Sequence, residues 1–160
     1  MIKRYSRKEI ANIWEEKNKY QIWLSIEIAA AQAMEKLKLI PKGIALTVRK
    51  RAKINIVRIH KIENKVHHDF IAFLSSITEK VGNEGKFLHQ GMTSSDVIDT
   101  CFNFQLVQAG KILNKDIDEI LQVLKNKSLR YKNTICMGRS HGIHAEPTTF
   151  GLKLAGFYEE

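Results

Sequence analysis

The chain has 160 residues, of which 44% are hydrophobic and 27% charged; this excludes a disordered chain and is enough for one domain, or a domain and a half, with a sizeable core. No apolar run approaches the roughly 20 residues of a membrane-spanning helix, and the polar residues after Met1 lack the apolar stretch of a secretory signal, so we expect no membrane association. The two cysteines, Cys101 and Cys136, have no motif spacing, which favours a reducing, cytoplasmic compartment with both as small core residues rather than a disulfide.

The net charge of +9 is concentrated in one segment of the chain. Residues 36–65 contain ten Lys and Arg and a single acidic residue, Glu63, whereas the rest of the chain contains the two kinds in equal number. Such a segment is either a solvated helix face or a surface that binds nucleic acid or another polyanion. Because it has no aromatic residue to stack on bases, we favour the solvated face and expect no nucleic-acid partner.

Hydrophobic spacing predicts helices throughout the first part of the chain. Ser6 and Glu9 are three residues apart, as in a capping box at the start of a first helix. Apolar residues then recur at helical spacing over about 18–38, and a proline and a glycine end this amphipathic helix. Two short helices are expected next, over about 44–52 and 55–66.

The second part of the chain is predicted to begin with a helix capped by Asp69 and to continue into a much longer one. The run Thr93–Asp96 is rich in N-capping residues, and the helical spacing behind it has one weak point, Gly110, which we interpret as a kink or a domain border. Residues 134–147 lose the helical pattern and are expected to form a loop. Pro147 would then occupy the first position of a last helix. The predicted fold class is all-α.

Three short clusters at helix ends have side chains suited to binding. Arg4 and Tyr5 offer a guanidinium and a phenol for a phosphate, although exposed residues near a terminus often have no such role. The run His67-His68-Asp69 places a carboxylate beside a histidine, which could fix its tautomer, or it is a surface histidine and a cap. Thr93-Ser94 begins a helix, where N–H groups and the helix dipole favour a carboxylate or a phosphate; the same residues are also common N-caps.

A fourth cluster, Gly138–Pro147, contains His141, His144, Arg139 and Glu146 in a glycine-containing stretch between helices. Titratable residues on a loop held by rigid helices are a common form of active site. A metal site is disfavoured because the stretch has no HExxH pattern and no nearby cysteine ligand. A nucleophilic serine is disfavoured as well, because there is no GxSxG turn.

Together these clusters resemble the adenylosuccinate lyases, a family of the fumarase/aspartase superfamily. The resemblance rests on four motifs in the same order and spacing: Ile2–Ser6, His67–Phe73, Gly91–Thr100 and Gly138–Gly151. Other superfamily members share the Thr-Ser helix start but usually lack the sequence His-Ala-Glu-Pro-Thr-Thr-Phe-Gly. The resemblance implies an N-terminal helical domain over 1–110 and the beginning of a central helix-bundle domain over 111–160.

The resemblance also implies a reaction without cofactor or metal. In this family a base removes a proton from the succinyl Cβ, fumarate leaves, and a general acid protonates the departing nitrogen of a nucleotide. His141 matches the general acid, and His68 matches a second catalytic histidine that binds and orients the substrate, with Asp69 beside it in the same site.

The remaining matches concern substrate binding. Thr93 and Ser94 match the pair that holds a succinyl carboxylate, and Arg4 and Tyr5 match residues that contact the nucleotide phosphate. His67 stands where relatives have Arg or Lys, so it would donate a hydrogen bond without a permanent charge.

One family element is missing from this sequence. The general base of the family is a serine in a downstream Gly-Ser-Ser-x-Met-Pro loop, which the 160 residues do not contain. We therefore interpret the chain as an N-terminal fragment that is inactive by itself, of an enzyme that forms homotetramers with active sites shared between subunits. The alternatives are another superfamily lyase, acting on argininosuccinate or a carboxymuconate, and a non-catalytic basic helical module that binds nucleic acid.

Overall fold

The computed structural model describes residues 2–160, and the chain separates into two compact units, Met1–Ala109 and Gly110–Glu160. One long helix, α6 (Ser94–Arg130), begins in the first unit and ends in the second. The predicted assignment of 1–110 and 111–160 to the two superfamily domains stays a prediction. Over the described residues the chain is helical except for one two-stranded sheet, so the predicted fold class is confirmed with that exception.

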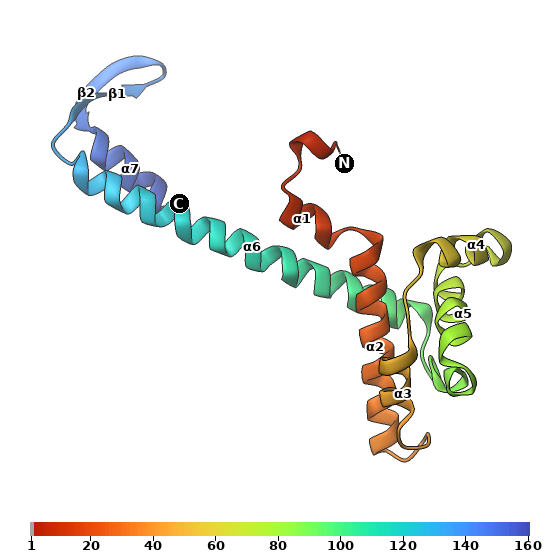
Figure 1. Ribbon diagram of the computed structural model, residues 1–160. Helices are drawn as coiled ribbons and strands as arrows, with labels where there is room; N and C mark the ends of the chain where they lie inside the picture. The colour runs from red at the N-terminus through yellow and green to blue at the C-terminus, as the bar shows by residue number, and fades with distance from the viewer. Residues whose placement is uncertain (1) are drawn as a thin grey trace. The chain divides into compact units, whose positions relative to one another are not determined.

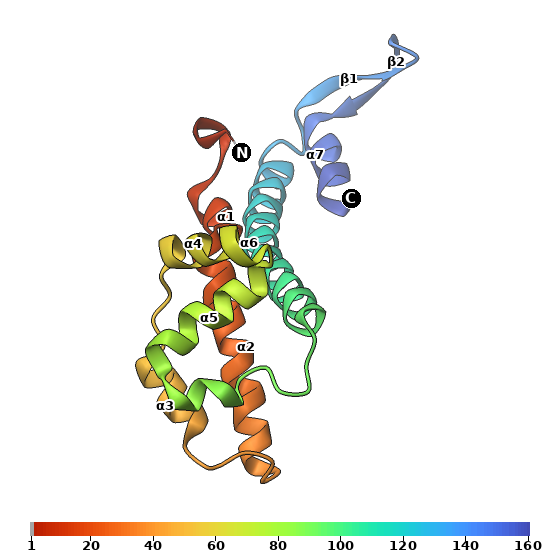
Figure 2. The ribbon, with the colours of Figure 1, turned by 90° about the vertical axis from the view of Figure 1, so that its right-hand side faces the viewer.

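The first unit is made of helices (Figure 1), and these helices surround an aromatic core. In it α3 lies beside α2, and α4 packs against α5, as Figure 2 shows from a second side. The predicted helices of this part are confirmed within a few residues. Their bounds, with those of two short 3-10 helices, are η1 (Lys3–Tyr5), α1 (Lys8–Ile13), α2 (Glu16–Lys36), α3 (Ile44–Arg51), α4 (Ile56–Val66), α5 (Asp69–Val81) and η2 (Asn83–Phe87).

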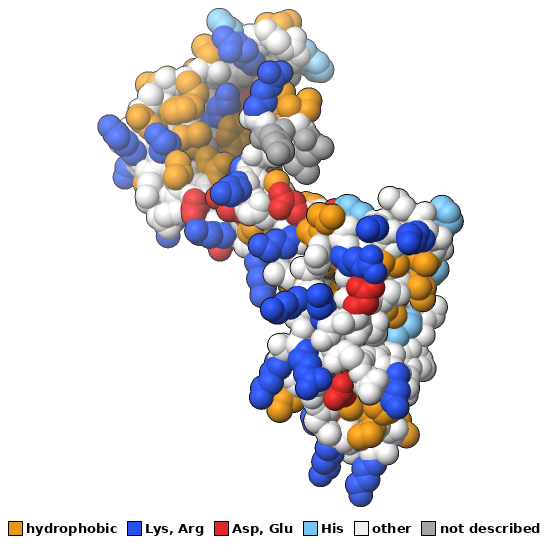
Figure 3. All heavy atoms as spheres, turned by 45° about the vertical axis from the view of Figure 1, so that its right-hand side comes forward, with side chains coloured by type: hydrophobic (Ala, Val, Ile, Leu, Met, Phe, Trp, Pro, Cys, Tyr) orange, Lys and Arg blue, Asp and Glu red, His pale blue; other side chains and the backbone are white. Residues whose placement is uncertain are grey.

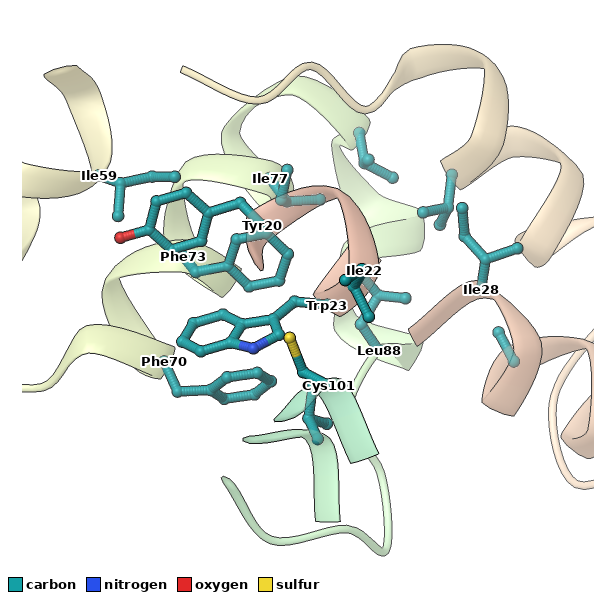
Figure 4. Packing of buried hydrophobic residues seen from close by; sticks show 14 of the residues in the cluster. Tyr20, Ile22, Trp23, Ile28, Ile59, Phe70, Phe73, Ile77, Leu88 and Cys101 are labelled. Carbon is teal, nitrogen blue, oxygen red and sulfur yellow. The ribbon is translucent and has the colours of Figure 1, made fainter. Parts of the chain in front are cut away.

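The core of the first unit is centred on Trp23 of α2 (Figure 4). Phe70 and Phe73 of α5 lie 5.0 and 5.4 Å from its ring, centroid to centroid, and Tyr20 stacks on Phe73 at 5.7 Å. All four side chains are at most 1% exposed, and each such burial contributes about 1.5–3 kcal/mol. Val97 and Cys101 of α6 are also part of this cluster, so the first turns of the long helix are fixed to the core.

Two predicted N-caps in the first unit are wrong by one residue each. The N-cap of α1 is Arg7 rather than Ser6, whose hydroxyl donates to the carbonyl of Ile2 at 3.0 Å. The N-cap of α5 is His68 rather than Asp69. Asp69 is the first helical residue, and its Oδ1 accepts from the N–H of Phe70 at 2.7 Å. A histidine ring nitrogen has thus taken the place of the expected carboxylate.

The basic segment is confirmed to be largely on the surface, and part of its charge has a structural explanation (Figure 3). Arg58 pairs with Glu79 of α5, and Arg51 donates to the carbonyl of Val81 at 3.3 Å. Arg49, Lys50 and Arg51 lie in the last turn of α3, where the negative end of the helix dipole favours cations.

The second unit corrects the prediction of a loop over 134–147. This stretch forms an antiparallel hairpin of β1 (Ile135–Ser140) and β2 (Ile143–Thr149). Pro147 lies in β2 opposite Met137 and does not begin the last helix. Helix α7 (Phe150–Glu159) starts after Thr149, whose Oγ1 accepts from the N–H of Leu152 at 3.2 Å.

Helix α7 returns along the end of α6 (Figure 1, Figure 2). The N–H of Gly151 donates to the carbonyl of Tyr131 at 3.0 Å, and the N–H of Phe150 donates to that of Thr134 at 2.8 Å. A Cβ at Gly151 would lie 2.6 Å from the backbone N of Lys132, so only glycine permits this approach. Gly151 is the only buried residue among 110–160, all of which are described.

Candidate functional site

The junction between α4 and α5 carries the predicted histidine pair. His67 ends α4 in the left-handed region with φ 52°, and His68 follows in extended conformation as the N-cap of α5. This sharp change of direction separates the two helices within two residues. Both histidines are exposed, so their rings are accessible to a ligand.

His68 is oriented by the helix that follows it. Its Nδ1 accepts a long hydrogen bond of 3.4 Å from the N–H of Ile71 and lies 3.7 Å from Oδ1 of Asp69. An accepting Nδ1 places the proton of the neutral ring on Nε2. Nε2 is therefore the atom of His68 that could donate to a substrate. The predicted pairing of His68 with Asp69 is present as a close approach rather than as a tight ion pair.

Thr93 and Ser94 begin helix α6, as their N-capping types predict. The N–H of Thr93 donates to Oδ2 of Asp96 at 2.8 Å, and the N–H of Asp96 donates back to the carbonyl of Thr93 at 3.1 Å. The first N–H groups of an α-helix have no acceptor within the helix, and the dipole is positive there. This end of α6 can accept a carboxylate, although the carboxylate of Asp96 already offsets part of the positive potential.

Arg4 and Tyr5 lie together in η1 and are exposed, Tyr5 by 75%. The guanidinium of Arg4 lies over the Tyr5 ring, 4.8 Å from its centroid. The two side chains therefore form one cationic and aromatic surface, of a kind that can bind a phosphate through the guanidinium.

His141 occupies the turn of the hairpin. His141 and Gly142 both have positive φ, 52° and 75°, and Ser140 pairs with Ile143 across them. Two left-handed residues match the right-handed twist of the flanking strands, and histidine tolerates this conformation better than most side chains. The imidazole is exposed at the hairpin tip, which suits a group that must reach a substrate.

The rest of the hairpin aligns the other polar residues of this motif. Arg139 is the cross-strand partner of His144, and the register shifts between Met137 and Arg139. A Cβ at Gly138 would lie 2.7 Å from the carbonyl oxygen of Glu146, so the bulge needs glycine at this position. A paired, glycine-dependent ribbon holds His141 in a more defined place than a loop would.

The structure brings together the members of each predicted cluster. Arg4 with Tyr5, the residues 67–69, and Thr93 with Ser94 lie at three element ends of the first unit, whereas His141 belongs to the second unit. Within residues 2–160, no group of three or more His, Cys, Asp or Glu is arranged to hold a metal ion. Over the same residues, no helix is both long enough and apolar enough to cross a membrane.

Sequence reasoning missed one polar pair, Glu27 and His89. Glu27 lies on the buried face of α2 with 1% exposure, and Oε1 and Oε2 contact Nδ1 and the backbone N–H of His89. The sequence contains half of the signal, because Glu27 stands four residues after Trp23 on the apolar face of α2, where an acid needs a partner; it does not identify His89 as that partner.

Comparisons with known protein sequences agree that the chain is similar to lyases. A family described as lyase matches residues 3–160. The chain is 49% identical over 160 residues to a curated protein of Streptococcus mutans named adenylosuccinate lyase, covering 100% of this chain and 37% of that protein. The chain thus spans just over a third of the length of this curated relative.

Solved structures share the fold at low sequence identity. A fumarate lyase from Mesorhizobium sp. BNC1 superposes with a TM-score of 0.90 at 23% identity, over 97% of this chain and 38% of that one. A beta-carboxy-cis,cis-muconate cycloisomerase from Acinetobacter calcoaceticus sp. ADP1 gives 0.87 at 23% identity, over 96% and 38%. At this identity the two likenesses establish the fold alone.

Proposed function

Because the chain belongs to the lyase family, we propose that it carries the general acid and the substrate-binding residues of an adenylosuccinate lyase. The observation that carries the proposal is the 49% identity to the Streptococcus mutans protein of that name along all 160 residues. The reaction is the elimination of fumarate from adenylosuccinate, which leaves AMP. Succinylaminoimidazole carboxamide ribotide would be a second substrate with the same succinyl group.

The elimination needs two proton transfers on opposite sides of the breaking bonds. A base removes a proton from the succinyl Cβ, the new C=C bond forms as the C–N bond breaks, and the nitrogen keeps the bonding electrons. His141, as the imidazolium, donates its proton to that nitrogen, so that AMP leaves with a neutral amine. The base is assigned to a serine that the 160 residues do not contain.

The first unit provides the binding groups in this proposal. Thr93 and Ser94 hold a succinyl carboxylate at the start of α6, where the helix dipole favours an anion. Nε2 of His68 donates to the substrate, the N–H of Ile71 keeps the ring in position, and Asp69 lies beside it in the same site. Arg4 and Tyr5 contact the phosphate, while His67 supplies a weaker donor in place of a permanent cation.

We further propose a cytoplasmic homotetramer whose active sites combine residues of different subunits. The apolar surface of the second unit supports this proposal (Figure 3). Leu113, Ile117 and Ile120 of α6 recur at helical spacing and are 53%, 52% and 57% exposed. An unpaired apolar stripe of this kind is typical of a helix that packs against other helices.

The test compares His141→Gln with the unchanged enzyme, expressed with its whole coding sequence, by following fumarate release from adenylosuccinate. We expect kcat to fall by about 10²–10⁴-fold, the usual contribution of a general acid. His60→Gln is the matched control, since His60 is a half-exposed surface histidine that contacts Glu16, and it should keep full activity.

Two results would contradict the proposal. Normal turnover by His141→Gln would remove the acid assignment, and an unchanged enzyme that releases no fumarate from either purine substrate would remove the function. For the 160 residues alone we expect no turnover. Mixing inactive His68→Gln and His141→Gln subunits should restore part of the activity if sites are shared between subunits.

A further inference from the structure

We propose that Glu27 is a positioning residue, which holds His89 and thereby the segment 88–93 that leads into Thr93 and Ser94. This inference deepens the proposed function and rests on it, because it assigns a purpose to the carboxylate-binding end of α6. Glu27 itself touches no reacting atom in the proposal.

The contact between Glu27 and His89 uses both carboxylate oxygens. Oε2 accepts from the backbone N–H of His89 at 2.8 Å, and Oε1 lies 2.8 Å from Nδ1 of the same residue. The Glu27 side chain is 1% exposed and that of His89 16%. Because the carboxylate contacts both the backbone and the ring of His89, it fixes the position of this residue and the orientation of its ring together.

His89 needs these contacts because its backbone is in the left-handed region. It adopts φ 59°, and Gly91 two residues later adopts 71°, so the chain turns twice in the left-handed region within this short segment. A non-glycine residue in that region costs about 1 kcal/mol or more and persists only where the surroundings hold it. The two hydrogen bonds to Glu27 supply that support.

The segment is otherwise fixed by apolar contacts. Leu88 is buried in the core cluster, and Met92 packs partly buried against it. The His89 ring lies 4.6 Å from that of Phe70, centroid to centroid. Leu88 and Met92, which flank His89 in this segment, are thus anchored to the core. Thr93 follows directly after Met92.

A purely structural role would not require a carboxylate at position 27. Burying a charged group as fully as Glu27, which is 1% exposed, is costly, and an apolar side chain of similar size often stabilises a core at least as well. The carboxylate of Glu27 is explained by the segment 88–93 that it holds, because this segment must place Thr93 and Ser94 accurately. An error of about 1 Å in the position of such a binding group can cost up to about a hundredfold in kcat/KM.

The test is Glu27→Gln in the full-length enzyme, with Glu35→Gln as the matched control. Both acids lie on α2 and accept a backbone N–H, since Oε1 of Glu35 accepts from Ala45 at 2.7 Å, but Glu35 holds the start of α3. Glutamine keeps the size and loses the charge and one acceptor. We expect KM for adenylosuccinate to rise about tenfold in Glu27→Gln with a smaller change in kcat, because lost ground-state binding appears in KM. Glu35→Gln should leave both constants unchanged.

Hydrogen exchange gives an independent reading on the 160-residue chain. The amide of His89 should exchange faster in Glu27→Gln, while amides in the middle of α2 and α5 keep their protection. His89→Asn, which tolerates the left-handed conformation, should raise KM as well. The double variant should be no worse than the more severe single variant if Glu27 acts through His89.

The outcomes separate the two proposals. Fumarate release by the unchanged enzyme tests the function alone. If that activity is present but Glu27→Gln has wild-type KM and wild-type exchange at His89, the positioning role is wrong. If Glu27→Gln does not fold, His89→Asn decides, because normal kinetics in that variant would equally overturn the inference. An equal loss in Glu35→Gln would mean that any weakened contact of α2 has this effect.

Discussion

The two units of this chain use the same residue types in opposite ways. In the first unit, aromatic and aliphatic side chains of five helices meet in one closed cluster around Trp23. In the second unit, residues of the same kinds along α6 and α7 stay on the surface; Ile120 is 57% and Leu152 65% exposed. The first unit is therefore stabilised by burial of its own apolar side chains. The second unit has apolar side chains of similar kinds, but they lack partners that would bury them.

The largest expected difference between the units is in hydrogen exchange. Amides in the middle of α2 and α5 should be protected up to the global free energy of unfolding, typically about 5–15 kcal/mol, and those of the β1–β2 hairpin should approach the unprotected rate. The expected gap is several orders of magnitude, measured by mass spectrometry on the 160-residue chain. Equal protection of both regions would mean that the hairpin and α7 are stabilised by association.

A second experiment compares large-to-small substitutions in the two units. Phe73→Ala removes a fully buried ring and should lower the free energy of unfolding by about 3–5 kcal/mol. Ile117→Ala removes a side chain that is 52% exposed and should change it by less than about 0.5 kcal/mol. Urea unfolding measures both. A large loss in Ile117→Ala that depends on protein concentration would show that another copy covers α6.

The contact between α6 and α7 provides a third test, within the second unit. Gly151→Ala would bring a Cβ to 2.6 Å from the backbone N of Lys132, and overpacking of this kind costs about 1–3 kcal/mol. The amides of Phe150 and Gly151 should then lose protection. Gly156→Ala is the matched control in α7, because nothing lies within 4 Å of its Cβ, and it should stabilise the helix by up to about 1 kcal/mol.

The smallest expected effect is a pH dependence that belongs to the first unit. Burial, with the nearby charges of Glu16, Glu63 and Asp69, raises the pKa of Tyr20 from 10.0 to about 12. Below pH 10 the phenol is protonated in both states and has no effect on stability. Between the two pKa values the unfolded chain loses the proton and the folded chain keeps it, so stability falls as pH rises.

Tyr20→Phe should remove this alkaline loss, measured as the slope of unfolding free energy against pH. Tyr158→Phe, in the second unit and 37% exposed, should retain it. An unchanged slope in Tyr20→Phe would mean that other groups cause the alkaline loss.

The parts of the fold that were predictable are those with strong local signals. The apolar spacing of α2 and the run of N-capping residues before α6 determine those helices almost independently of their surroundings. The same spacing says nothing about which faces find partners, so the exposure of Ile117 and Ile120 was not predictable. The start of α5 was misassigned because a carboxylate at Asp69 is the commoner cap, and only the backbone geometry shows that the ring of His68 has that position.

The candidate site was also predicted only in part, because local sequence signals indicate some of its elements and not others. The clusters at 4–5, 67–69 and 93–94 are short in sequence and keep their neighbours in the structure. The hairpin was missed because Gly138 and Pro147 are unfavourable in strands; the signal that indicates it is the His141-Gly142 pair, a two-residue turn between β-compatible segments. The contact between Glu27 and His89 joins residues 62 positions apart, and local patterns do not contain such information.

The hairpin has a practical consequence for handling the isolated chain. A two-stranded ribbon leaves one side of each strand without a hydrogen-bonding neighbour, and such edges can recruit strands from other molecules. Pro147 lacks an N–H and so makes β2 a poorer template, whereas β1 contains no proline. Strand-to-strand aggregation during storage should therefore begin at β1, and a lysine introduced at the exposed Ile135 would be the first change to try against it.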